Sequence, residues 1–353
     1  MRWGSIMQLH ESVTPEAQRV ARTLNIDISK VTASCMSIGN GQVALCQRWV
    51  FEDGDGHVQT AVAKMPSTDE SSRSTAKSLH LYRRETSFYR ELLPQVSVPT
   101  PQIFHVEYGD DDDFLLVMED LTPSRSLDQF AGLSLGDAQT ALRGLSKLHA
   151  PTARRTDLFQ LPWLGQVSLE LAPMYAQILP SLFKLFFNRY HLDLDEATRN
   201  TVHQVAENLG SVGTSPPEVA CVLHGDFRTD NLIFDGRDGA QPFAVVDWQT
   251  ISVGSPMADV AYFITTSLNH EDRKSYEQEL LNFYLTEMLD LGVELSPATA
   301  RHEFAQATIG PIIMLVAASV YVERTDRGDA MFLTMIRRAV QAVRDWHVFE
   351  GGI

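Results

Sequence analysis

The stretch VLHGDFRTDNLIF, residues 222–234, places polar side chains inside an otherwise apolar run. His224, Asp226 and Asn231 are flanked by segments with the composition of buried strands. A buried polar group destabilises a fold unless it is hydrogen-bonded or used for function. Taken alone, an Asp in a His-Gly-Asp turn is more often a backbone-bonding turn residue than a catalytic group. The rest of the chain decides between these two interpretations.

A further carboxylate, Asp247, directly follows a second buried-strand pattern, FAVV at 243–246. Asp226, Asn231 and Asp247 can therefore converge at strand ends. Carboxylate and amide oxygens are the ligands that Mg²⁺ takes beside the phosphates of a substrate. Protein kinases have the same order of residues, with an Asp, an Asn five residues later and then a metal-binding Asp. One Asp of this set is left free to accept a proton from an attacking hydroxyl.

The same template requires a Lys on the third strand and a helical Glu that holds it. Lys64 follows TAVA at 60–63 in the third expected strand, and the segment 74–93 has helical periodicity. Glu85 falls on the apolar face of that helix, together with Leu79, Tyr82, Tyr89 and Leu92. We therefore predict that Glu85 is buried and pairs with Lys64. Glu91 falls off the apolar face and should see solvent.

The first third of the chain predicts an antiparallel sheet. Segments 31–39, 42–51 and 57–65 read as successive strands, with Asp53–Gly56 as a hairpin turn. Two more strands at 103–109 and 114–121 are joined by Asp110–Asp113, which we interpret as a solvated turn and not as a cation site. Thr14 before Pro15 predicts the N-cap of a short helix.

After Leu121 the pattern is largely helical, interrupted by short strands near 222, 232 and 243. We therefore predict an α+β, two-lobed protein-kinase-like fold. Residues 1–119 would form an N-terminal nucleotide-binding lobe with an antiparallel sheet plus a helix. Residues 120–353 would form a larger, mainly helical C-terminal lobe for catalysis and substrate binding.

Composition narrows the class of protein. The 353 residues carry a net charge of −16, which argues against a binder of nucleic acid phosphates. Cys35, Cys46 and Cys221 are typical of reduced thiols in a cytosolic protein. Apolar segments such as 311–322 have the length of a buried helix, and no run predicts a membrane span. We expect a cytoplasmic protein that acts on a small molecule, with no indication of its oligomeric state.

Three segments of the chain resemble a known family of kinases. HGDFRTDNLIF at 224–234, followed by VVDWQTISVGSPMADVAYF at 245–263, resembles the aminoglycoside phosphotransferase and choline kinase-like superfamily. The DWQ and PMADVAYF segments, with YRRETSFYREL at 82–92, are most similar to its ecdysteroid-kinase-like branch. The resemblance covers roughly residues 37–263. It implies transfer of the γ-phosphoryl group of ATP to a hydroxyl of a small molecule, with Mg²⁺ as cofactor.

The resemblance also implies roles for individual residues. Asp226 would be the catalytic base, and Asn231 and Asp247 would hold Mg²⁺. Lys64 would contact the α- and β-phosphates and would be held by Glu85.

Other implied roles concern the surroundings of this centre. Gly39 and Gly41 lie in a turn that would cover the phosphates, although a Gly-x-Gly pair alone is a weak signal. The backbone of Glu119 to Leu121 would receive the adenine. His224 would brace the loop, and Asp259 would cap its helix and tie it to the loop. Arg228 lies where protein kinases often place a Lys near the γ-phosphate, a role that we state as a hypothesis.

Two other functions stay open. Asp-Trp-Gln replaces Asp-Phe-Gly and no Ala-Pro-Glu segment follows, so an activation loop is missing and a protein kinase is disfavoured. A nucleotide-binding pseudokinase or scaffold would not need Asp226. The acceptor is not indicated: sterols, sugars, choline-like amines, aminoglycosides and hydroxyacyl thioesters all suit the superfamily.

Several residues have a structural alternative. Asp193, Asp195 and Glu196 fit a solvated helix start better than a site for a cationic substrate. For Trp163, Tyr175 and Tyr190 in the helical region, core packing is favoured over substrate contact. His149 is interpreted as a structural residue at a helix end.

Overall fold

The structure is a computed structural model that describes residues 14–38, 43–125, 127–209, 216–321 and 324–349. Side chains of 165–172, 174 and 175 are not among those described. Gly39 and Gly41, which we expected to cover the phosphates, lie outside the described residues. The side chain of Tyr175 does so as well.

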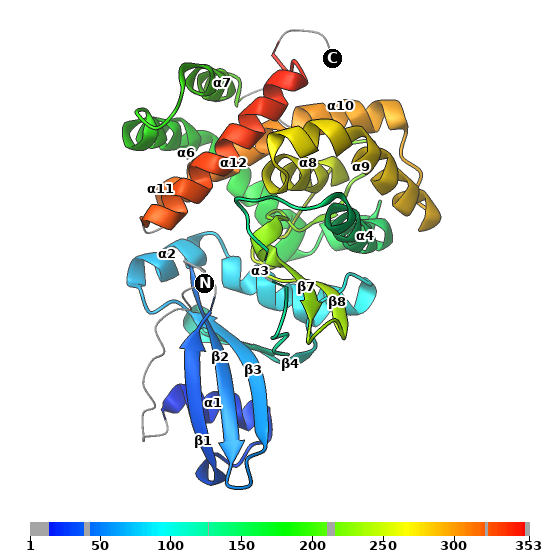
Figure 1. The fold of residues 1–353 in the computed structure, drawn as a ribbon. Coiled ribbons are helices and arrows are strands. Elements are labelled where there is room, and N and C mark those ends of the chain that lie inside the picture. Colours follow the sequence, from blue (N-terminus) through cyan, green and yellow to red (C-terminus); the bar gives the residue numbers. More distant parts are fainter. Residues whose placement is uncertain (1–13, 39–42, 126, 210–215, 322–323, 350–353) are drawn as a thin grey trace.

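A five-stranded antiparallel sheet occupies the N-terminal part, as the sequence predicted (Figure 1). Its strand order is β1-β2-β3-β5-β4. The strands are β1 (Val31–Ser37), β2 (Ala44–Asp53), β3 (Val58–Pro66), β4 (Ile103–Tyr108) and β5 (Phe114–Met118). Lys64 pairs in register with Cys46 on β2 and Leu116 on β5, so it lies at the middle of the sheet.

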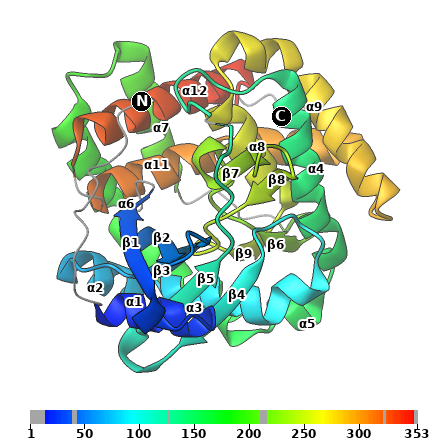
Figure 2. The same cartoon turned by 60° about the horizontal axis from the view of Figure 1, so that its bottom comes forward.

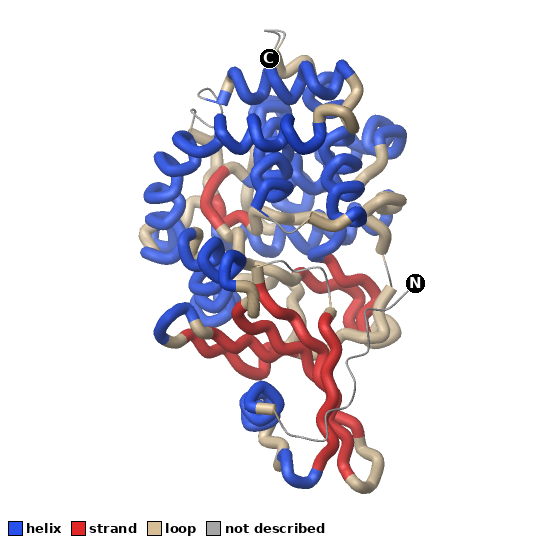
Figure 3. Tube along the Cα trace, turned by 90° about the vertical axis from the view of Figure 1, so that its left-hand side faces the viewer, coloured by secondary structure: helices blue, strands red, loops and turns tan. Residues whose placement is uncertain are grey.

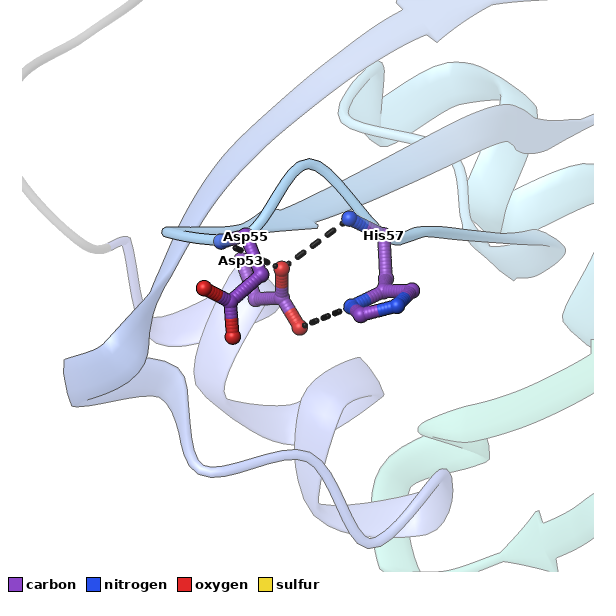
Figure 4. A group of neighbouring side chains, drawn as sticks. All are labelled: Asp53, Asp55 and His57. Atoms are coloured by element: carbon purple, nitrogen blue, oxygen red, sulfur yellow. Dashed lines mark hydrogen bonds and ion pairs between the residues drawn. The ribbon is translucent and has the colours of Figure 1, made fainter.

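The β2–β3 hairpin closes at the Asp53–Gly56 turn that the sequence indicated. Asp53 Oδ1 accepts hydrogen bonds from the amides of Asp55 and His57 at 2.9 and 3.0 Å, and Oδ2 lies 3.1 Å from His57 Nδ1 (Figure 4). These three side chains are close enough to suggest a cation site. Their hydrogen bonds, however, run within the turn, as an Asx-type turn requires, so the structure explains the cluster without a ligand.

The expectation of one continuous helix over 74–93 is wrong. The segment folds as α2 (Glu70–Ser78) and α3 (Leu81–Ser87), followed by a π-helical turn at Phe88–Leu92. His80 between them has φ +55°, a left-handed conformation that ends the first helix. The break gives α3 its own direction, and Glu85 still falls on its buried side.

Helices make up most of the chain after β5 (Figure 3). They are α4 (Leu135–Thr152), α5 (Thr156–Phe159), α6 (Val167–Tyr190), α7 (Glu196–Glu207), α8 (Pro256–Ser267), α9 (His270–Asp290), α10 (Pro297–Ala307), α11 (Ile309–Tyr321) and α12 (Asp326–Asp345). Two small antiparallel pairs interrupt them. β6 (Cys221–Leu223) pairs with β9 (Ser252–Gly254), and β7 (Leu232–Gly236) pairs with β8 (Gln241–Val245). In Figure 2 these pairs lie between the sheet and the helices.

Three hydrophobic clusters organise this arrangement. The first lies on the outer face of the sheet, where α1 (Pro15–Thr23), capped by Thr14 as predicted, packs on Trp49 and Phe51. The second and largest joins the inner face of the sheet to α3, α4, α8 and the short strands. The third holds α6, α7, α11 and α12 together. Because residues of both the sheet and the helical part contribute to the second cluster, the loops between these two parts are packed on a common core.

Helices α10 and α11 run end to end over Pro297–Tyr321. By length and composition alone this 25-residue stretch could cross a membrane, contrary to the expectation from sequence. Half of its most apolar window is buried within the fold, and α11 packs against α6 and α12. The core helix of a folded domain has the same composition.

Candidate active site

Lys64, Glu85 and Asp247 form an ion cluster between β3, α3 and the segment after β8, with Lys64 and Glu85 buried and Asp247 partly exposed. Lys64 Nζ lies 2.8 and 2.7 Å from the two Glu85 carboxylate oxygens and 2.8 Å from Asp247 Oδ1. Glu85 is fully buried and Lys64 is 8% exposed. The structure thus brings together three residues that are 21 and 183 positions apart in the chain. Glu91, as expected, is exposed.

The electrostatics of this cluster follow from burial and from the excess of negative charge. Burial alone would lower the pKa of Lys64, but the charges of Asp247 and Glu85 outweigh it and raise the pKa above its ordinary value. Burial raises the pKa of Glu85, and Asp247 adds to this while Lys64 opposes it. Burial also opposes ionisation of Asp247, yet Lys64 lowers the pKa of that carboxyl. Lys64 is therefore a permanent cation at this position.

The loop after β6 carries Asp226 and Asn231 to a point beside Asp247. Asn231 Nδ2 donates to the Asp226 carbonyl oxygen at 2.8 Å and to its Oδ2 at 2.9 Å. The Val246 amide donates to the Asn231 carbonyl oxygen at 3.0 Å, which sets Asp247 next to Asn231. His224 Nε2 bonds the Val246 carbonyl oxygen at 3.1 Å, and its Nδ1 accepts from the Asp226 amide at 3.2 Å. His224 is fully buried, and these contacts hold the loop.

Arg228 lies against the same carboxylate. Its Nε is 3.1 Å from Asp226 Oδ1, and its Nη1 is 2.5 Å from Asp230 Oδ2 and 3.7 Å from the sulfur of Met331 on α12. Burial works to lower the pKa of Arg228, but Asp226 and Asp230 raise it above the ordinary value. The guanidinium thus orients Asp226 from the side of α12.

Gly225 permits the tight turn that exposes Asp226. Its φ is +83°, and a Cβ at this position would overlap the Thr250 carbonyl group. We expect Gly225→Ala to lower the free energy of unfolding by more than about 2 kcal/mol, since strain and overlap add. Gly56→Ala is the matched control, because Gly56 has the same φ and nothing within 4 Å of its added Cβ. Equal losses for the two variants in denaturant titrations would contradict this account.

Asp259 corrects one expectation from sequence. The cap of α8 is Ser255, whose hydroxyl accepts from the Met257 amide, and not Asp259. Asp259 lies in the first turn, where its Oδ2 and Oδ1 accept from the amides of His224 at 2.6 Å and Gly225 at 2.9 Å. The predicted tie between α8 and the loop is therefore present: the buried carboxylate finds its donors in the loop amides, while the cap position is taken by Ser255.

A buried chain behind Asp259 was not anticipated in full. His149 Nε2 lies 3.2 Å from Asp259 Oδ2, and His149 Nδ1 lies 2.7 Å from the Tyr284 hydroxyl. All three side chains are at most 1% exposed. His149 at the end of α4 is thus structural, as expected, and it joins α9 to the loop. No sequence signal pointed to Tyr284.

The pH dependence of stability provides a test of this chain. Burial opposes the ionisation of Asp259, but His149 and the loop amides lower the pKa of that carboxyl below its ordinary 3.8. A lowered folded-state pKa contributes stability above the unfolded pKa, and this stability is lost as pH falls through the folded pKa. We expect Asp259→Asn to cost about 2 kcal/mol at neutral pH. The difference from wild type should shrink as the pH falls below 3.8 in denaturant titrations, whereas exposed Asp290→Asn should show no such trend.

Tyr262 is a site residue that sequence reasoning missed. It lies three residues after Asp259 on α8, is 6% exposed, and its hydroxyl interacts with the Asp226 carboxylate. Burial and the charge of Asp226 raise the pKa of Tyr262 well above its ordinary value, so it stays a donor. The i, i+3 spacing from Asp259 puts both on one helix face, and this signal could have identified it.

The segment after β5 presents backbone groups beside the sheet. The Glu119 amide donates to the Gln102 carbonyl oxygen, and the Arg237 amide donates to the Leu121 carbonyl oxygen. Within the described part of the chain, the Glu119 carbonyl and the Leu121 amide have no hydrogen-bond partner. Asp120 between them is buried and binds Arg48 and Thr122. One acceptor and one donor are therefore available at this edge.

The oxygen donors needed for a divalent cation are also available. Asn231 Oδ1 and Asp247 Oδ2 accept no hydrogen bond from any described residue, while their partner atoms are engaged. Asp247 has φ +68°, a left-handed conformation that is costly for a residue other than Gly. Such conformations persist where surrounding contacts enforce them, often at functional sites. Hard, oriented oxygens at this point fit Mg²⁺.

Other candidate residues are placed away from this centre. Asp195 caps α7 by accepting from the Thr198 amide, and its neighbours Asp193 and Glu196 are exposed, so they form a solvated helix start. Trp163 and Tyr190 are 3% and 1% exposed and pack in the core, which is the interpretation favoured from the sequence.

Residues 48–295, well over half of the chain, match the ecdysteroid kinase-like family. The chain belongs to the ecdysteroid kinase-like family. The resemblance seen in 224–263 is thereby confirmed.

Individual relatives cover the chain to different extents. Acyl-CoA dehydrogenase family member 11 from Gallus gallus is 32% identical over 148 residues, which are 40% of this chain and 18% of that protein. The chain thus spans less than a fifth of the length of this curated relative. The GDP complex of aminoglycoside 2'-phosphotransferase-IIIa has a TM-score of 0.53 at 14% identity, covering 92% of this chain and 97% of that one. An aminoglycoside phosphotransferase from Alicyclobacillus acidocaldarius has a TM-score of 0.51 at 14% identity, covering 99% and 98%. At such identities the solved structures show the fold alone, which is the two-lobed kinase-like α+β fold.

Proposed function

We propose that this protein transfers the γ-phosphoryl group of ATP to a hydroxyl of a small molecule. The observation that carries the proposal is the position of Lys64. It binds Glu85 and Asp247 together, next to the loop that presents Asp226 and Asn231. Phosphoryl transfer depends mainly on positioning and charge neutralisation, and this arrangement has one permanent cation and an oriented carboxylate.

Asp226 would act as the base toward the acceptor hydroxyl. Asn231, Arg228 and Tyr262 hold its carboxylate in one orientation, so an acceptor O–H that reaches it meets a fixed lone pair. A fixed base at hydrogen-bond distance is the geometric condition for proton transfer. Arg228 would also lie close to the transferred phosphoryl group, since it contacts the same carboxylate.

Asn231 and Asp247 would hold Mg²⁺ through Asn231 Oδ1 and Asp247 Oδ2. The ion, when bound, neutralises phosphate charge. Lys64 would contact the α- and β-phosphates, and Glu85 would keep its ammonium group directed at them. Gly39 and Gly41, which lie outside the described residues, would cover the phosphates.

The backbone at Glu119 and Leu121 would receive the adenine. The free Glu119 carbonyl can accept from an exocyclic amino group, and the free Leu121 amide can donate to a ring nitrogen. The related aminoglycoside 2'-phosphotransferase-IIIa was solved with GDP, so GTP belongs beside ATP in any binding assay. In this proposal residues 1–119 form the nucleotide-binding lobe and residues 120–353 the catalytic lobe.

The partner would be a hydroxylated small molecule and not a nucleic acid or a membrane, and the location would be cytoplasmic. The net charge of −16 disfavours a phosphate backbone. The described residues close to Asp226 include no cluster of free carboxylates that would bind a polycation: Asp230 is paired with Arg228.

An ATP-consumption screen over hydroxylated metabolites tests this function. The panel should hold sterols, sugars, amino alcohols, aminoglycosides and hydroxyacyl thioesters, the last because the curated relative is named for acyl-CoA dehydrogenases. We expect acceptor-dependent ADP release and a phosphorylated product by mass spectrometry. Labelling of a peptide array in place of small molecules would indicate a protein kinase. Mg-ATP binding without turnover on any acceptor would indicate a scaffold.

A further inference from the structure

Arg84, the residue before Glu85, is a buried arginine to which no role in phosphoryl transfer is assigned above. Arg84 on α3 is 6% exposed. Its Nε and Nη2 donate to the Ile251 carbonyl oxygen, the first at 3.0 Å, and Nη2 also donates to the Thr250 carbonyl oxygen at 3.0 Å. A buried guanidinium is costly unless its donors are engaged, and here it holds two consecutive carbonyl groups of one segment.

That segment connects the metal-binding position to the catalytic loop. It begins three residues after Asp247 and continues into β9, which pairs with β6. The Thr250 hydroxyl donates to the His224 carbonyl oxygen at 3.0 Å, and the Thr250 carbonyl group packs directly against Gly225. Arg84 therefore contacts backbone that is itself bonded to the loop presenting Asp226.

The π-helical turn that continues α3 makes a second contact, with the residue that directly follows Asp247. Phe88 stacks on Trp248 with ring centroids 3.7 Å apart and an interplanar angle of 10°. Trp248 in turn lies against His224, with centroids 4.7 Å apart. Glu85 lies between the two contacts. A helix held at both points cannot rotate or slide without moving Glu85 away from Lys64.

We infer that Arg84 is a positioning residue that sets the Lys64–Glu85 pair relative to Asp226 and Asp247. By binding the Thr250 and Ile251 carbonyls, it makes the position of α3 depend on the catalytic loop and not on an external activator. This inference rests on the proposed nucleotide site. It predicts that Arg84 affects nucleotide binding through Glu85, although Arg84 itself does not reach the nucleotide.

Arginine and lysine differ at such a position. The guanidinium has several donors in a rigid plane, so it can bind two adjacent carbonyl groups at once. A lysine would retain the charge and most of the packing, but it would form fewer hydrogen bonds with the two carbonyl groups. Arg84→Lys should therefore give an intermediate effect, and Arg84→Met the full effect. Arg83, the preceding residue on α3, is exposed and supplies the matched controls Arg83→Lys and Arg83→Met.

The experiment measures Mg-ATP affinity by calorimetry, with thermal unfolding of the apo protein as a check on folding. We expect Arg84→Met to weaken Mg-ATP binding about tenfold, because hydrogen bonds to a charged group are lost. The affinity of Arg84→Lys should lie between those of Arg84→Met and wild type. Both Arg83 variants should bind as wild type does. If Arg84→Met does not fold, Arg84→Lys against Arg83→Lys decides alone. Affinity at the wild-type level for a folded Arg84 variant overturns the inference.

A double-mutant cycle separates positioning from general stabilisation. In a Glu85→Gln background, the further loss from Arg84→Lys should be within about twofold, because both residues act through Lys64. An undiminished loss in that background would show that Arg84 acts independently of Glu85 and would overturn the inference. Wild-type protein that binds no Mg-nucleotide would overturn the proposed function as well, so the two failures are distinguishable.

Discussion

Replacing Asp226 by alanine should abolish phosphoryl transfer while Mg-ATP still binds. The variant loses the only proposed proton acceptor for the hydroxyl, a contribution of about 10²- to 10⁴-fold in rate. Lys64 keeps both its carboxylate partners, and Asn231 keeps its bond to the backbone carbonyl of residue 226 at 2.8 Å. Single-turnover rates with the acceptor found by screening, beside calorimetric Mg-ATP affinity, provide the measurement.

The control for this variant removes an exposed carboxylate from the next turn along the chain. Asp238 is exposed in the turn between β7 and β8, so Asp238→Ala should transfer at the wild-type rate. Turnover by Asp226→Ala at a rate similar to that of Asp238→Ala would show that Asp226 is not the base. Loss of Mg-ATP affinity by Asp226→Ala would show instead that it serves the nucleotide.

Asp247→Ala should lose both nucleotide affinity and turnover. Truncating one member of a buried charge pair typically weakens binding by roughly two to three orders of magnitude. Here the variant also removes the free Oδ2 that we assign to the metal. Lys64 remains paired with Glu85 at 2.8 Å, so the sheet and α3 should stay folded. The stabilisation of wild-type protein by Mg-ATP in thermal unfolding should therefore disappear in the variant.

The effect of Mg²⁺ on ATP binding distinguishes the proposed roles of Asp226 and Asp247. With EDTA in place of Mg²⁺, wild type should bind ATP as weakly as Asp247→Ala does, since both would lack the cation that neutralises phosphate charge. Asp226→Ala should retain its response to Mg²⁺. If Asp247→Ala were still stabilised by Mg-ATP to the wild-type extent, the assignment of Asp247 to the metal would be wrong.

Much of the fold could be predicted because local patterns carry it. Short segments rich in apolar, Thr and aromatic residues and broken by Gly and Asp located all five strands of the sheet, and Thr14-Pro15 located the start of α1. The break at His80 could not be predicted, since a left-handed non-Gly residue leaves no reliable pattern. The α8 cap was misassigned because Ser255 and Asp259 are both plausible caps in sequence.

In the candidate site, too, some residues could be predicted from the sequence and others could not. Asp226, Asn231 and Asp247 lie within 22 residues and have a recognisable order, so their convergence was predictable. Arg84 and Tyr262 were missed, because their partners lie 167 and 36 positions away and local periodicity marks both only as buried. The structure places Arg228 on Asp226 and Asp230, and its role at the phosphate stays a hypothesis.

By itself, the sequence determined the kinds of elements, the order of the chemical groups and the family, because these depend on residue type at short spacing. Only the tertiary structure decided which further groups support them: Tyr284 and His149 behind Asp259, Tyr262 beside the base and Arg84 on the buried side of α3. These contacts are made by side chains of different helices and the backbone of one loop. They exist only once the shared core has packed those helices together, because burial then requires each polar group to find a partner.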